Sequence, residues 1–219
     1  MANVGMLLSR PPKPVVFALC AVPATLIGLD ALHGRLGADP IRAMQLRTGW
    51  WALGFLLITL AVTPVRRFTG WNGIARYRRM LGLFAFTYAA LHFLNYLVLD
   101  QFFAWHFILE DVAKRRWITV GFTSFVLLIP LAVTSTNGWV RRLGKRWVKL
   151  HRLAYVAAAG GVLHFLWLVK KDVREPVIFG VVLVALLALR LGRRPRSPRA
   201  VPAAGPRAET SHQIAGARP

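Results

Sequence analysis

Six stretches of the chain are almost entirely apolar, and each is bounded by Arg, Lys, Asp or Glu. Each is close to the roughly 20 residues that an α-helix needs to cross a bilayer. The stretches run over 14–32, 48–65, 81–99, 117–134, 151–168 and 176–191. This pattern predicts an all-α, polytopic membrane helix bundle with six transmembrane helices.

Charge is distributed unevenly over the connecting segments. With the N-terminus in the cytoplasm, the inner segments carry 20 Lys and Arg and one acid, Glu209, whereas the outer segments carry 9 basic and 7 acidic residues. Short loops rich in Lys and Arg stay in the cytoplasm, so we expect both termini there. The net charge of +21 then reflects topology and attraction to anionic membrane lipid. No folded nucleic-acid-binding motif accompanies it, so we expect no nucleic-acid partner.

The six spans form one expected domain, 14–191, between a cytoplasmic N-terminus, 1–13, and a basic cytoplasmic tail, 192–219. The tail is rich in Pro, Arg, Ala and Gly. It cannot bury enough apolar surface to fold alone, which predicts disorder. Cys20 is the only cysteine, so the chain can form neither an intrachain disulfide nor a cysteine metal cluster.

Two segments, 60–98 and 131–169, share an ordered set of features. Each begins with LAVT, passes a basic loop that contains Arg-Arg, and continues into a span that reaches LHFL. The separation from Thr63 to His92 is 29 residues, and that from Thr134 to His164 is 30. The order and spacing indicate a parallel repeat about an axis along the membrane normal. The repeat places the two histidines at matching depth in the outer part of the bilayer.

Ionisable residues inside membrane spans are costly and are usually functional. For either histidine alone, the alternative is a neutral ring bonded to a neighbouring helix, but the matched depth of His92 and His164 favours a shared ligand. Neutral imidazole binds Zn, Cu and Fe. Zinc would need further donors, whereas two imidazoles suit the axial positions of a haem iron. The alternative function is a small membrane transporter in which histidines relay protons.

Three residues near the inner rim are further candidates. Thirteen residues separate His151 from His164, which puts them roughly 140° apart around a regular helix. In the first repeat, the position that corresponds to His151 is occupied by Arg79. His151 is therefore either a ligand of a second haem or an interfacial histidine. Arg78 and Arg79, with Arg146, are suited to pair with haem propionates or an anionic flavin; solvated loop arginines are the alternative.

Several linked phrases resemble the MsrQ family. They are LAVTPVRRFTG, RRMLGLFAFTYAALHFLNYLVLDQ, the combination of TSTNG with W-x-x-LHRL-x-Y, and LHFLWLVKKDVREP. The likeness runs from about residue 10 to 191, and MsrQ proteins are similar to the membrane part of ferric reductases and NADPH oxidases.

The resemblance implies a multi-pass b-type cytochrome of the bacterial inner membrane. It implies electron transport to MsrP, a periplasmic molybdopterin enzyme that repairs methionine sulfoxide in oxidised proteins. Electrons are expected from the quinone pool, or from FMN with a cytosolic flavin reductase. Family haem ligands fall on His92, His151 and His164, with one or two haems b as cofactors and quinone as a further possible one.

The sequence lacks the motifs expected of a nucleotide-binding or hydrolytic enzyme, which is consistent with a protein that only carries electrons. No glycine-rich nucleotide fingerprint follows a strand, and no Ser/His/Asp or paired-carboxylate constellation occurs. We therefore expect an electron-transfer subunit rather than the catalytic subunit of a reductase system. A structural anchor for MsrP is a third alternative.

Overall fold

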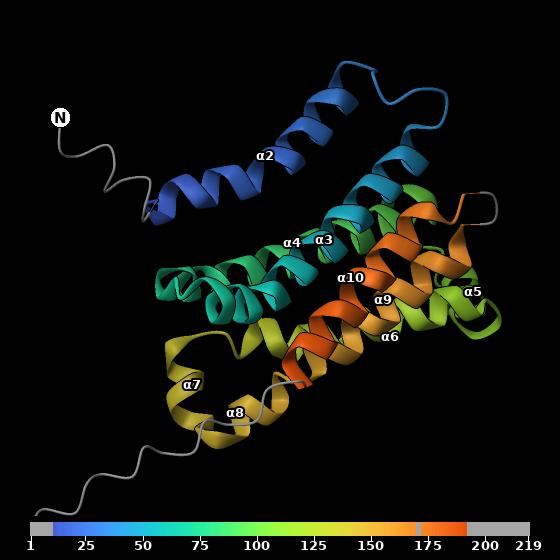
Figure 1. Ribbon diagram of the computed structural model, residues 1–219. Helices are drawn as coiled ribbons and strands as arrows, with labels where there is room; N and C mark the ends of the chain where they lie inside the picture. The colour runs from blue at the N-terminus through green and yellow to red at the C-terminus, as the bar shows by residue number, and fades with distance from the viewer. Residues whose placement is uncertain (1–10, 170–171, 192–219) are drawn as a thin grey trace, which may run out of the picture.

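The computed structural model describes residues 11–169 and 172–191 (Figure 1). These residues form helices and connecting turns, with no strand among them. The predicted tail, 192–219, and residues 1–10 of the predicted N-terminal segment lie outside the described residues.

Six long helices overlap the six predicted apolar stretches. They are α2 (Lys13–Leu32), α3 (Pro40–Thr69), α4 (Arg78–Leu94) continued by the π-helix η2 (Asn95–Asp100), α6 (Arg116–Val133), α9 (Leu153–Leu168) and α10 (Arg174–Leu191). Shorter elements are the 3₁₀-helix η1 (Asn72–Tyr77), α5 (Trp105–Lys114), α7 (Asn137–Leu143) and α8 (Lys145–Leu150). The predicted all-helical class is confirmed.

Four helical segments are long and apolar enough to cross a membrane: α2, α3, the continuous segment Asn72–Asp100 and α6. The helices α9 and α10 occupy the fifth and sixth predicted spans and have 16 and 18 residues. The fifth helix begins at Leu153, two residues after the predicted start. His151 therefore lies in the turn before α9, and the angle calculated for a regular helix does not apply to it.

The bundle is built from two helix pairs. α3 packs mainly on α4, and α6 packs mainly on α9. α4 contacts α6, α3 contacts α9, and α10 leans on α9 and α3, which joins the pairs into one body. α5 lies at one end of the bundle, whereas α7, α8, the start of α2 and the end of α10 lie toward the other (Figure 1). The pairs are the halves of the predicted repeat.

Local sequence sets where the longest helix, α3, begins and ends. The side chain of Asp39 accepts a hydrogen bond from the backbone N–H of Arg42 at 3.0 Å, and Pro40 occupies the first helical position, where its missing N–H costs nothing. The helix stops at Gly70, whose φ of 71° is left-handed and favours glycine. After this cap the chain continues through η1 to the start of α4.

Small residues let the paired helices approach closely. Ala85 on α4 and Ala157 on α9 are 0% and 1% exposed, and they stand 72 residues apart in the chain. Ala158 is also fully buried and belongs to the same hydrophobic core as Leu60 and Leu131. Close backbone approach through small residues is how membrane helices gain packing energy.

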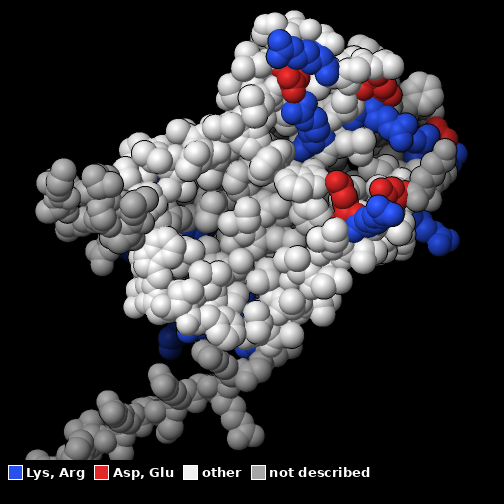
Figure 2. Space-filling view, turned by 45° about the horizontal axis from the view of Figure 1, so that its top comes forward, with Lys and Arg blue, Asp and Glu red and all other residues white. Residues whose placement is uncertain are grey.

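Charged side chains are gathered at the ends of the molecule. In Figure 2 the Asp and Glu residues of the visible face lie together with Lys and Arg at the end that carries α5, and a broad uncharged surface separates them from the other end. Three ion pairs belong to this acidic end: Arg47 to Asp30 at 2.7 Å, Lys114 to Glu110 at 2.5 Å and Arg115 to Asp111 at 2.9 Å. An uncharged belt between charged ends is the surface that a multi-pass membrane protein requires.

Tyr88 connects α2 to the rest of the bundle. Its hydroxyl donates to the carbonyl of Cys20 at 2.9 Å and accepts from the N–H of Ala24 at 2.8 Å, beside Pro23. Cys20 and Ala24 are four residues apart, the spacing that a helix normally joins directly. The hydroxyl thus contacts both ends of one helical hydrogen bond.

Replacing Tyr88 by Phe removes both contacts from a side chain that is 1% exposed. We expect the free energy of unfolding to fall by about 1 kcal/mol, the usual contribution of an interhelical hydrogen bond in a membrane. The measurement is thermal unfolding in detergent. Thr87→Val is the matched control, because Thr87 is exposed and its hydroxyl bonds only within α4. Equal melting temperatures of Tyr88→Phe and Thr87→Val would contradict the role of Tyr88 in connecting α2 to the bundle.

Candidate functional site

A cavity of about 330 Å³ lies between the two helix pairs. Ligand sites in proteins usually have volumes of about 300–1,000 Å³. His92 from α4 and His164 from α9 both line it, with ring centroids 6.1 Å apart and ring planes at 83°. The structure therefore brings together the two histidines that the repeat predicted to share one ligand.

Each histidine is held by a backbone carbonyl of the neighbouring helix. Nδ1 of His92 lies 2.9 Å from the carbonyl oxygen of Gln45 on α3, and Nδ1 of His164 lies 2.7 Å from that of Trp117 on α6. A carbonyl can only accept, so both rings carry their proton on Nδ1 and leave Nε2 unprotonated. This second hydrogen bond is the usual way in which proteins orient a metal-binding imidazole.

Glycines make these two hydrogen bonds sterically possible. Gly49 stands four residues after Gln45, and a Cβ there would lie 2.9 Å from the ring of His92. Gly121 stands four residues after Trp117, and a Cβ there would lie 2.6 Å from Nδ1 of His164. Since real Cβ atoms do not come that close to a ring, only glycine lets each imidazole reach the carbonyl one turn earlier.

The lining of the cavity repeats with a constant offset. Gln45, Gly49 and His92 recur 72 residues later as Trp117, Gly121 and His164. Apolar positions of the wall follow the same offset, among them Leu46 with Ile118, Trp50 with Phe122, Leu53 with Phe125, Leu56 with Leu128 and Phe93 with Phe165. The cavity therefore lies on the pseudo-two-fold axis of the repeat.

A polar relay on α3 and η2 breaks this symmetry. The amide nitrogen of Asn95 donates to the side-chain oxygen of Gln45 at 2.6 Å, and the amide of Gln45 donates to Nε2 of His92 at 3.3 Å. The side-chain oxygen of Asn95 is buried without a hydrogen-bond partner. Nε2 of His164 has no such neighbour in the described part of the chain, so the two rings differ in how their free nitrogens are covered.

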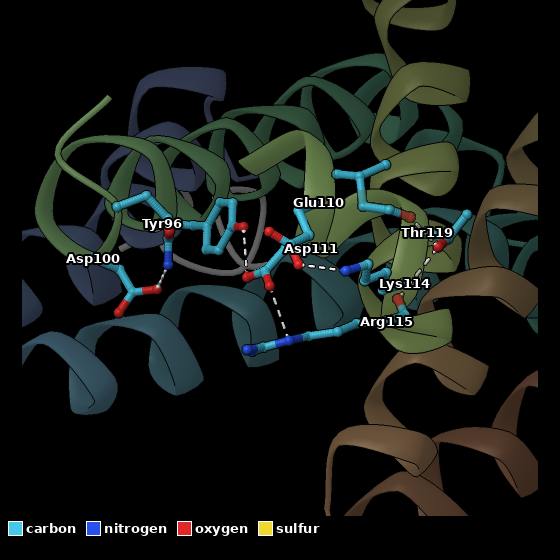
Figure 3. A network of polar contacts seen from close by, with 9 residues as sticks. Tyr96, Asp100, Glu110, Asp111, Lys114, Arg115 and Thr119 are labelled. Carbon is cyan, nitrogen blue, oxygen red and sulfur yellow. Dashed lines mark hydrogen bonds and ion pairs between the residues drawn. The ribbon is translucent and has the colours of Figure 1, made fainter. Parts of the chain in front are cut away.

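The cavity reaches the acidic end of the molecule beside α5. Asp111 accepts from the hydroxyl of Tyr96 at 3.2 Å and pairs with Arg115 at 2.9 Å, and all three line the cavity (Figure 3). Next to them Lys114 pairs with Glu110 at 2.5 Å, which lowers the pKa of that exposed carboxyl. The predicted site thus has a charged rim beside α5 that the sequence did not single out.

His151 lies apart from this cavity, in the turn between α8 and α9. Its ring stacks on Trp147 with centroids 3.8 Å apart, and its Nδ1 lies 3.2 Å from the Trp147 carbonyl oxygen. Nε2 of His151 is buried and has no hydrogen-bond partner. The ring does not line the cavity of His92 and His164.

The two candidate arginines also lie away from the cavity, at the start of α4. Arg78 donates to the hydroxyl of Thr63 at 3.4 Å, and its charge acts on His151. Arg79 is exposed and donates to the side chain of Asn137 at the start of α7. Arg78 is thus the one of the pair that lies near His151.

The residues that sequence reasoning missed are those that hold the imidazoles: Gln45, Gly49, Trp117 and Gly121. A signal existed, because the 72-residue offset between the histidines also relates the two glycines. Their role needs the three-dimensional contact, since it rests on a backbone carbonyl that has no sequence signature.

The chain matches a known family over half its length. The model of the ferric reductase like transmembrane component matches residues 48–162, which include both helix pairs up to Val162. No solved structure matches the chain.

Curated relatives match more of the chain. A protein of Rhodospirillum rubrum is 53% identical over 84% of this chain and 91% of its own length. A protein of Herminiimonas arsenicoxydans is 52% identical over 82% of this chain and 84% of its own length. A protein of Xanthomonas euvesicatoria is 47% identical over 83% of this chain and 86% of its own length. Each is described as the heme-binding subunit MsrQ of a protein-methionine-sulfoxide reductase. With this identity over most of its length, the chain belongs to the MsrQ family.

Proposed function

We propose that the chain is a haem b-binding, membrane electron-transfer subunit in which His92 and His164 are the axial ligands of one iron. The observation that carries the proposal is the cavity between the helix pairs, where two imidazoles of the same tautomer meet at 6.1 Å. The names of the relatives support it, since those proteins are described as heme-binding subunits.

The residues present fit a haem better than a metal ion alone. No group of three or more His, Cys, Asp or Glu able to hold a metal occurs among the described residues. A metal between these rings would therefore need equatorial donors that are not side chains, and a porphyrin supplies four nitrogens. The two rings lie close enough, with centroids 6.1 Å apart, for one group in the cavity to be held by both. Haem bound in this way supplies a one-electron carrier.

The protein's own residues orient the ligands and exclude water. The carbonyls of Gln45 and Trp117 fix the ring tautomers, and the glycines permit that contact. Phe93, Phe165 and the other apolar wall residues give the site a low dielectric. Burial, axial-ligand identity and hydrogen bonding to the ligands are the terms by which a protein sets a haem potential.

We further propose that His151 ligates a second, inner haem. Support comes from its buried Nε2, which makes no hydrogen bond within the described part of the chain. Its repeat counterpart is Arg79, so the second axial position would not come from a symmetric histidine. Arg78, which lies near His151, and Arg79 are proposed to face the anionic groups of a cofactor on this side.

The proposed route runs from the inner end to the outer end of the bundle. The donors are the quinone pool, or FMN supplied by a cytosolic flavin reductase, and the acceptor is a periplasmic molybdopterin reductase of the MsrP type that repairs methionine sulfoxide. The placement follows from the charge asymmetry of the sequence, which predicts six spans over 14–191 and cytoplasmic termini in the bacterial inner membrane. The acidic outer rim near Tyr96, Asp111 and Arg115 is the part of the cavity nearest the acceptor.

Substitution of either axial histidine tests the proposal directly. His92→Ala and His164→Ala should each remove the haem of the cavity, lower the haem-to-protein ratio and abolish electron delivery to the acceptor. The measurements are reduced-minus-oxidised spectra and methionine-sulfoxide reduction in reconstituted vesicles. His106→Ala is the control, because His106 is exposed on α5. Unchanged haem content and spectra in the His92 and His164 variants would refute the ligand assignment.

Substitution of the two glycines tests the geometry that holds the ligands. Gly121→Ala and Gly49→Ala should push the rings off their carbonyls and weaken haem retention by roughly 10- to 100-fold, the usual cost of losing a hydrogen bond to a metal ligand. Gly54→Ala on α3 is the matched control, because its Cβ would meet only Trp50 at an ordinary 3.8 Å. Equal rates of haem transfer to apomyoglobin from all three variants would show that the glycines do not set the ligand position.

A further inference from the structure

The guanidinium of Arg190, at the inner end of α10, is half-buried inside the bundle. It donates to the carbonyl of Leu60 at 2.8 Å and to the hydroxyl of Tyr155, and it lies over the Tyr155 ring with 5.0 Å to the centroid. Its Nε is buried without a hydrogen-bond partner. A guanidinium has five N–H donors, so the protein satisfies only part of this group.

Part of this arrangement is structural. Pro64 stands four residues after Leu60 and has no N–H, so it cannot complete the helical hydrogen bond to the Leu60 carbonyl. Arg190 donates to that freed carbonyl and thereby fastens α10 to α3. A neutral donor would serve this purpose equally well, so the contact does not explain why the residue carries a charge.

The surroundings of Arg190 add positive charge and no negative charge. The charges that act on it are those of Arg78 and Arg67. Arg78 donates to Thr63, one turn from Leu60 on the same helix. The three ion pairs among the described residues all involve acids of the outer end. Within the described part of the chain, this half-buried cationic group therefore has no carboxylate partner.

We propose that Arg190 and Arg78 bind an oxyanion, the phosphate or carboxylate group of a cofactor or lipid, at the inner end of the bundle. A half-buried charge without a counter-ion is costly, and an unsatisfied buried N–H adds to the cost. An oxyanion that accepts from Nε of Arg190 removes both costs, because guanidinium donors match phosphate and carboxylate geometry. The site lies away from the cavity of His92 and His164 and needs no haem there; it rests on the role proposed above for Arg78 and adds Arg190 to it.

The test uses full-length protein purified in phosphate-free detergent with defined lipid. The probes are inorganic phosphate and FMN, followed by thermal shift, and phosphatidylglycerol, followed as a retained adduct in native mass spectrometry. Arg190→Gln removes the charge but keeps an amide that can donate to Leu60. Arg174→Gln is the control, because Arg174 is exposed at the opposite end of the same helix.

We expect at least one probe to bind saturably to the parent protein. Arg190→Gln and Arg78→Gln should each weaken that binding roughly 10-fold or more, as the loss of a charge-assisted hydrogen bond does, whereas Arg174→Gln should leave it unchanged. Binding of FMN or phosphate without lipid identifies a cofactor oxyanion, and retention of phosphatidylglycerol alone identifies a lipid headgroup. A shifted haem midpoint potential in Arg190→Gln, with no probe bound, identifies the carboxylates of a haem.

Arg190→Lys keeps the charge and decides the result if Arg190→Gln does not fold; it should retain part of the binding. The proposal is overturned if both Arg190 variants bind every probe as tightly as the parent does. It is also overturned if the parent binds none of them and its haem potential is unaffected by the substitutions. The Soret band of the haem proposed between His92 and His164, recorded on the same samples, reports separately on the proposed function.

Discussion

The site depends on two hydrogen bonds, each from an imidazole to a main-chain carbonyl of the neighbouring helix, and each possible because a glycine stands one turn after that carbonyl. At Gln45 and Gly49, and again at Trp117 and Gly121, the missing Cβ opens a helix surface so that a histidine of the neighbouring helix can dock on its backbone. The bond fixes the tautomer and the ring orientation before any metal is present. A side chain at either glycine would move the donor atom, whereas most other wall residues only shape the cavity.

The rest of the fold serves this arrangement. Small residues such as Ala85 and Ala157 bring each helix pair close together, and the pairs then face each other across the cavity with a constant 72-residue relation. The end of the bundle that carries α7 and α8 departs further from this symmetry. There Arg79 stands at the repeat position that corresponds to His151, and Arg190 of α10, a helix outside the repeat, donates to the Leu60 carbonyl. The cavity wall thus follows the repeat apart from the polar relay at His92, whereas the opposite end of the bundle does not.

Much of the framework could be predicted from the sequence, because a bilayer requires long apolar runs and a repeat carries its own spacing. The helices and the pairing of His92 with His164 followed from these two constraints, whereas the family resemblance rested on matching sequence phrases. The holding contacts could not be predicted, since a main-chain carbonyl has no residue type and a helical glycine has many possible uses. The hydrogen-bond partners of Arg190 could not be predicted from the sequence either, because no repeat or residue spacing connects α10 with Pro64 on α3. The start of the fifth helix, Leu153, is two residues later than predicted, because the chain turns at His151 and Arg152 between α8 and α9.

The central claim is that one iron is held between His92 and His164. Its most direct measurement is a cryo-electron microscopy structure of the purified, haem-loaded protein. The account predicts porphyrin density in the cavity between the helix pairs, with Nε2 of both histidines bonded to the iron and both Nδ1 atoms still bonded to the carbonyls of Gln45 and Trp117. A porphyrin located elsewhere, or an iron bound by neither or only one of these rings, would contradict it.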